Sequence, residues 1–150
     1  MRQEWRQRQV DLLSQVAQLL EGFKGELSTE QPLTGGIRID FVLRTGKAYY
    51  LVEIKGSSPG EYLSFATWGQ ITMYKKAMES WQTPNIPIIP VLFTNATLSD
   101  DLRETFEKSK IVVVKVQPGE DLSTTRQKMK RELQEMGLPI PEMNGHQNLS

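Results

Sequence analysis

Hydrophobic residues near the N-terminus recur every three or four positions, which is the spacing of one face of an α-helix. They include Val10, Leu13, Val16 and Leu20, so we expect a long first helix. Similar periodicity and capping residues recur three more times along the chain. The predicted helices cover residues 2–22, residues 61–80, a short segment from Thr97 or Ser99 to about Ser109, and a basic segment from Asp121 or Ser123 to about Gly137.

Five other segments carry the patterns of β-strands. Residues 37–44 and 48–55 alternate around a Thr45-Gly46-Lys47 turn, which is typical of a hairpin. Residues 88–94 and 111–116 are almost continuously apolar, as in strands buried on both faces, and residues 26–33 are a weaker candidate. The order α-β-β-β-α-β-α-β-α predicts an α/β (α+β) fold with a mixed central sheet flanked by helices.

The length of 150 residues suits a single domain, which we place at residues 1–137. Residues 138–150 contain two prolines and many polar side chains, so we expect a loosely ordered C-terminal tail. No apolar run reaches membrane-spanning length, and the N-terminus lacks the apolar region of a signal peptide. These features predict a cytoplasmic protein that does not contact a membrane.

Composition excludes several kinds of chemistry. The chain has no cysteine, which removes disulfides, thiolate nucleophiles, zinc ribbons and iron–sulfur clusters. Its one histidine, His146, lies in the polar tail, so histidine-based metal sites and Ser-His-Asp catalysis are not expected. The 18 basic residues balance the 18 acidic residues, so any binding of nucleic acid must come from local patches.

Three charged residues interrupt hairpin strands that otherwise have the pattern of a core. Asp40 lies near the middle of the first strand, and Glu53 and Lys55 share one face of the second strand because they are two residues apart. Buried charges persist only when they are paired or hold a metal, and Mg²⁺ binds through one or two carboxylates with waters and substrate phosphate. We expect Asp40, Glu53 and the Ile54 carbonyl to bind Mg²⁺ or Mn²⁺. Lys55 would orient or activate the attacking water, or stabilise charge on the phosphate.

These residues resemble the PD-(D/E)xK nuclease superfamily, which has a restriction-endonuclease-like fold. Asp40 corresponds to the first acid of the motif and Glu53-Ile54-Lys55 to its E-x-K, with Ile39 in place of the usual proline. The resemblance implies a metal-dependent phosphodiesterase, an endo- or exodeoxyribonuclease, that acts on nucleic acid and most naturally on DNA. Small nucleases of this fold often pair to reach both strands, so the resemblance is compatible with a homodimer or a protein partner and leaves the oligomeric state open.

The predicted second helix adds a further motif. Gln70 and Tyr74 are four residues apart and so face the same way. They resemble the Q-x-x-x-Y motif of RecB-like members, which implies that both side chains face the active site. Residues 65–74 also resemble the corresponding helix of XisH-type proteins, which are excision-controlling factors on the same fold.

Two questions stay open at the level of sequence. Many family members carry another acid on the first helix, and spacing does not choose among Glu4, Asp11, Glu21 and, on the weak strand, Glu30. The alternative function is a DNA-associated regulatory or assembly protein, such as an element-excision factor, that keeps the fold with little independent activity. The neutral net charge and small size favour that alternative. A nucleotide-binding domain is disfavoured, because no Gly-rich phosphate loop follows a strand.

Overall fold

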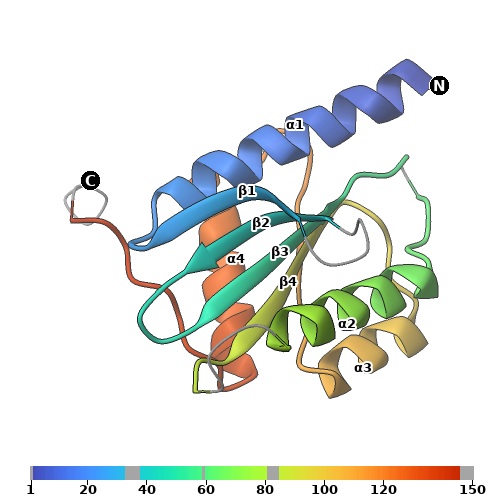
Figure 1. The fold of residues 1–150 in the computed structure, drawn as a ribbon. Helices are drawn as coiled ribbons and strands as arrows, with labels where there is room; N and C mark the ends of the chain where they lie inside the picture. The colour runs from blue at the N-terminus through green and yellow to red at the C-terminus, as the bar shows by residue number, and fades with distance from the viewer. Residues whose placement is uncertain (1, 33–37, 59, 81–84, 146–150) are drawn as a thin grey trace.

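A five-stranded sheet forms the centre of the computed structural model, which describes residues 2–32, 38–58, 60–80 and 85–145 (Figure 1). The spatial order of the strands is β1-β2-β3-β4-β5. The β1–β2 and β2–β3 pairs are antiparallel, whereas the β3–β4 and β4–β5 pairs are parallel. The elements are α1 (Arg2–Glu21), β1 (Glu26–Pro32), β2 (Arg38–Arg44), β3 (Tyr49–Lys55), α2 (Phe65–Glu79), β4 (Ile88–Thr94), α3 (Asp100–Lys108), β5 (Val112–Lys115) and α4 (Leu122–Glu135). Both the order of elements and the mixed sheet confirm the predicted α/β (α+β) architecture.

Helices cover both faces of the sheet (Figure 1). On one face α1 and α4 pack against the strands, with Leu19, Phe93 and Met129 fully buried between them. On the other face α2 and α3 enclose a second apolar layer that includes Leu92 and Phe106. Each fully buried side chain of this size contributes about 1.5–3 kcal/mol, so these two layers hold the strands in place around the candidate site.

Capping residues determine where the helices begin. The sequence left open whether Thr97 or Ser99 starts α3, and the structure shows the Ser99 hydroxyl accepting a hydrogen bond from the Leu102 amide at 3.2 Å. In the same way Asp121, not Ser123, caps α4. Local hydrogen bonding to water-exposed amides favours these short polar side chains at the cap position.

Helix α2 begins at Phe65, four residues later than its periodicity predicted. The preceding residues are extended because the Leu63 amide donates to the Thr97 carbonyl and the Thr97 amide donates to the Glu61 carbonyl. Ser64 then caps the helix by accepting from the Ala66 amide at 3.1 Å. A tertiary contact with the loop after β4 therefore overrides the local preference for helix.

Residues 138–145 follow α4 and cross the turn between α1 and β1. The Lys24 amide donates to the Glu142 carbonyl at 2.7 Å, and the Asn144 amide donates to the Gly22 carbonyl at 3.0 Å. The Tyr50 hydroxyl donates to the Pro139 carbonyl at 2.6 Å, and burial raises the pKa of Tyr50 to about 12, so it stays a donor at neutral pH. The described part of the predicted tail is thus bonded to the body of the protein. Across the part of the chain that the structure describes, no helix is both long and apolar enough to cross a bilayer.

We predict that Tyr50→Phe destabilises the protein by about 1 kcal/mol, because it removes this buried donor. Urea unfolding measures the loss, and limited proteolysis should show faster cleavage near Pro139. Tyr49→Phe is the matched control, because the Tyr49 ring packs under Arg44 and its hydroxyl has no hydrogen-bond partner among the described residues. Equal losses in the two variants would show that the Tyr50–Pro139 bond does not anchor the segment.

Candidate active site

The strands β2 and β3 separate from each other at Asp40 and Glu53. Their backbone pairing runs from Arg44↔Tyr49 to Phe41↔Val52, and Asp40 and Glu53 come next in this register. Beyond that point side chains replace the backbone ladder. The Asp40 amide donates to Oε1 of Glu53 at 3.2 Å, and the Ile54 amide donates to Oδ2 of Asp40 at 3.0 Å. Each carboxylate thus caps a backbone donor of the opposite strand, which holds the two acids side by side at the fork.

Burial makes Glu53 an unusual acid. Glu53 is only 6% exposed. Burial, together with the charge of Asp40, raises its pKa to about 8. The hydrogen bond from the Asp40 amide and the charge of Lys55 oppose this rise. Two neighbouring carboxyl groups, one of which has a strongly raised pKa, are a common property of functional sites, because such an arrangement weakens the folded protein unless a cation or a proton balances it.

Lys55, Gln70 and Tyr74 lie around this pair. Lys55 is two residues beyond Glu53 on β3 and so shares its face, as the sequence predicted. Tyr74, on α2, is buried against β2 and β3, and its pKa is raised first by burial and then by the charge of Glu53. A hydrogen bond with Gln70 acts in the opposite direction. The structure therefore brings all five predicted side chains together, while their catalytic roles remain predictions.

Gln9, on α1, also reaches the site, although it is not among the predicted site residues. Its Nε2 donates to the Ile54 carbonyl at 3.3 Å, and its Oε1 accepts from the Gly56 amide at 2.6 Å. A Cβ on Gly56 would lie 2.7 Å from Oε1 of Gln9 and 3.1 Å from its Cα, so a side chain there would displace Oε1 and push the helix backbone away by a few tenths of an ångström. The signal that could have found Gln9 was the Gly56 that follows the E-x-K motif, read as a point of close backbone approach.

No third acid completes the pair within the described residues, where no group of three Asp, Glu, His or Cys side chains is placed to hold a metal ion. Asp11 lies in a groove near the loop after β4, and Glu21 is exposed at the end of α1. The side chains of Glu4 and Glu30 lie outside what the structure describes. The available donors are two carboxylates and the Ile54 carbonyl, which fits the one or two carboxylates through which Mg²⁺ is bound in proteins.

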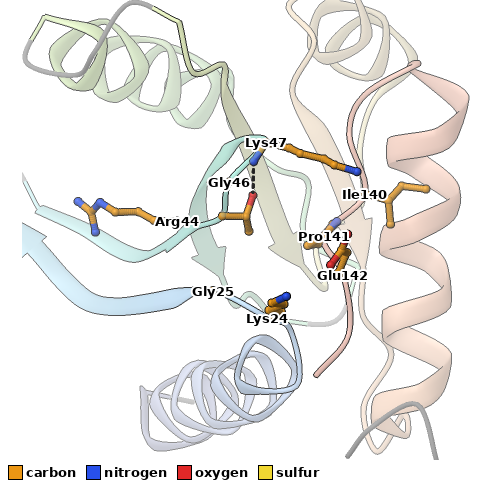
Figure 2. Close-up of a pocket in the computed structure, with 9 residues that line it drawn as sticks. Lys24, Gly25, Arg44, Gly46, Lys47, Ile140, Pro141 and Glu142 are labelled. Atoms are coloured by element: carbon orange, nitrogen blue, oxygen red, sulfur yellow. Dashed lines mark hydrogen bonds between the residues drawn. The ribbon is translucent and has the colours of Figure 1, made fainter. Parts of the chain in front are cut away.

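A cavity of about 340 Å³ lies at the opposite end of the β2–β3 hairpin, where Lys24, Arg44 and Lys47 are among its lining residues (Figure 2). Figure 2 shows Lys47 extending towards Ile140, whereas Arg44 points the other way. The Arg44 guanidinium donates to Ser28 at 3.0 Å. These cations do not converge, so this cavity lacks the arrangement of charges that the Asp40–Glu53 fork has.

Comparison with known proteins identifies the fold. No protein-family profile and no curated protein matches the chain. Its structure is similar to a repair endonuclease from Pyrococcus abyssi (TM-score 0.53, 18% identity, 75% of this chain and 47% of that one). It is also similar to EndoMS in complex with double-stranded DNA (TM-score 0.51, 14% identity, 71% of this chain and 45% of that one). A third similar structure is an XisH family protein from Nostoc punctiforme PCC 73102 (TM-score 0.50, 15% identity, 76% of this chain and 93% of that one).

The chain spans about half the length of the first two structures and nearly all of the third. Together these similarities confirm the restriction-endonuclease-like fold that the motifs predicted, and the structures that share it include an XisH family protein.

The raised pKa of Glu53 predicts how stability changes with pH. The folded protein keeps the proton up to about pH 8, whereas the unfolded chain releases it near the ordinary value of 4.5. The unfolded state then binds fewer protons, so this group lowers the free energy of unfolding as pH rises from about 4.5 to about 8. Glu53→Gln is neutral at every pH and should flatten this slope. Urea unfolding between pH 5 and pH 8 measures the free energy of unfolding of the wild type and the variant. The same dependence on pH in both proteins would contradict the burial of a protonated Glu53.

We also predict that Gln9→Ala destabilises the protein by about 1–3 kcal/mol, because it leaves the Gly56 amide and the Ile54 carbonyl without their side-chain partner. Gln18→Ala is the matched control, because Gln18 is an exposed glutamine of the same helix and its loss should cost less than about 0.5 kcal/mol. Chemical denaturation compares the two variants. A Gln9 variant as stable as the Gln18 variant would mean that Gln9 does not hold α1 against β3.

Proposed function

We propose that the protein is a Mg²⁺- or Mn²⁺-dependent nuclease that hydrolyses phosphodiester bonds in DNA. The observation that carries this proposal is the fork at Asp40 and Glu53, where two acids accept backbone hydrogen bonds across strands that would otherwise pair. A purely structural role does not explain two adjacent carboxylates, one buried and one half-buried, where the strands separate, because apolar residues of similar size would avoid the cost of removing them from water.

Asp40, Glu53 and the Ile54 carbonyl would hold the metal ion. Each carboxylate has two oxygens and about four lone-pair sites, so the backbone hydrogen bonds leave capacity for a cation. The Ile54 carbonyl accepts a long hydrogen bond from Nε2 of Gln9, at 3.3 Å. A bound divalent ion supplies charge neutralisation and lowers the pKa of a coordinated water, which is the chemistry that phosphodiester hydrolysis requires.

The other side chains act on the substrate and on one another. The Lys55 ammonium lies on the face of Glu53, where it would orient the attacking water and stabilise the charge that develops on the phosphate. Burial and the neighbouring acids keep the Tyr74 hydroxyl protonated, so Tyr74 acts as a hydrogen-bond donor. Gln70 bonds to Tyr74 and would hold it in position.

DNA is the substrate class that the comparisons favour. EndoMS, which shares the fold, was solved in complex with double-stranded DNA, and a second structure with this fold is described as a repair endonuclease. We further propose that two copies of the chain, or this chain with a partner protein, act together, because one active site of this size reaches one strand of a duplex.

Metal titration of the wild type and of Asp40→Asn/Glu53→Gln tests the site. Calorimetry should show Mg²⁺ and Mn²⁺ binding by the wild type and none by the double variant, because the variant has neither carboxylate. Cleavage of linear, circular, branched and single-stranded DNA should depend on the metal and fall by about a hundredfold or more in the double variant.

Lys55→Ala separates metal binding from chemistry. The variant should bind metal like the wild type, and its cleavage should fall by about a hundredfold or more, as in the double variant. Lys47→Ala, at the far end of the hairpin, should cleave like the wild type. Cleavage that persists without metal, or in the double variant, would contradict the proposal. Salt-sensitive DNA binding with no metal-dependent cleavage would instead assign the protein to the regulatory alternative.

A further inference from the structure

A polar groove lies at the carboxyl ends of the parallel strands β4 and β5, between α1 and the loop that follows β3. Two cavities of about 410 and 110 Å³ share Arg8, Asn95, Gln117 and Pro118, so they are two parts of one depression, which we call the end groove. Ligands of open sheets with parallel strands bind in such crevices outside the carboxyl ends of the strands.

The end groove adjoins the candidate active site. Arg8 precedes Gln9, which is bonded to the end of β3 at Ile54 and Gly56. Lys115, which lines the groove, belongs to the same row of the sheet as Lys55, because Lys55 pairs with Thr94 and Thr94 pairs with Lys115. Two strand spacings of about 4.8 Å put the backbones of Lys55 and Lys115 roughly 10 Å apart.

The charges of the groove suit a phosphate backbone. Arg8 and Lys115 line it, and neither forms an ion pair with any residue that the structure describes. Its one acid, Asp11, accepts a hydrogen bond from Gln7 at 2.8 Å. Two cations that form no ion pair within the described residues, beside the amide side chains of Asn95 and Gln117, are the groups that proteins use to contact phosphate oxygens.

An exposed tyrosine is paired, through its backbone, with a residue that lines the same groove. Tyr62 forms a β-bridge with Thr97, which lines the groove, and 66% of Tyr62 is exposed. A folded protein gains nothing for its own core from a tyrosine in this position. A cationic groove with an exposed aromatic side chain at its edge is the arrangement by which proteins bind single-stranded nucleic acid, because the ring stacks on an unpaired base.

We propose that the end groove binds an unpaired strand of the DNA substrate next to the phosphate to be cleaved. Arg8 and Lys115 contact its phosphates, and Tyr62 stacks on one of its bases. The proposal rests on the proposed nuclease function and adds to it the substrate class, which is DNA with a single-stranded segment, such as an end, a flap or a gap.

Fluorescence anisotropy with a labelled oligothymidine in EDTA, over a series of salt concentrations, tests the groove without any cleavage. Arg8→Ala/Lys115→Ala should weaken binding about tenfold or more, and the slope of log K against log salt should fall by about 1.4, since each phosphate contact on a single strand contributes about 0.7. Tyr62→Ala should weaken binding about fivefold or more, whereas Tyr62→Phe keeps the ring and the affinity.

Lys24→Ala/Lys47→Ala is the matched control, because it removes two cations from the cavity at the far end of the hairpin. Its affinity and salt slope should stay close to those of the wild type, and urea unfolding of every variant checks that the fold is intact. The proposal is overturned if the groove variant binds like this control, or if it loses affinity for a duplex more than for the single strand.

The readout also separates the two proposals. A wild-type protein that cleaves nothing, but whose single-strand binding depends on Arg8, Lys115 and Tyr62, would refute the nuclease function and support the groove. Metal-dependent cleavage that is unchanged in the groove variants, with unchanged single-strand binding, would support the nuclease and refute the groove.

Discussion

The candidate site depends on two crossed hydrogen bonds, in which the Asp40 amide donates to Glu53 and the Ile54 amide donates to Asp40. They end the β2–β3 ladder one residue pair beyond Phe41↔Val52, and they satisfy the two backbone amides that the separation exposes. Because a buried amide without a partner is costly, neither carboxylate can be lost without penalty to the fork. The same two bonds therefore shape the sheet and place the acids together.

The two adjacent acids destabilise the folded protein electrostatically. Glu53 is buried beside a second acid, and its pKa rises to about 8, so near neutral pH the pair holds a proton that isolated carboxyl groups would have released. Lys55 offsets part of the repulsion but does not remove it. A site that is less stable than an apolar replacement is a common trade between stability and activity, and the divalent cation that we propose would offset this cost.

Helix α1 connects the fork to the end groove. Gln9 holds the end of β3, and the absence of a side chain on Gly56 lets the helix come close enough to do so. Arg8 is the adjacent residue of the same helix and lines the groove. One rigid element thus positions both a contact behind the E-x-K strand and a cation on the proposed path of the substrate. A shift of α1 would move both, which makes the helix a structural link between binding and chemistry.

Local patterns in the sequence determined the order of elements, the mixed sheet and the pairing of Asp40 with Glu53, because strand alternation and a short hairpin turn specify register over a few residues. They also placed Gln70 and Tyr74 on one face of α2, since helical spacing is local. Only the tertiary structure decided the rest. Gln9 meets Ile54 across 45 positions of sequence, Tyr50 meets Pro139 across 89, and α2 starts late because residues 61–63 bond to the loop after β4. Such contacts depend on how helices dock on the sheet, and no periodicity within one segment encodes that docking.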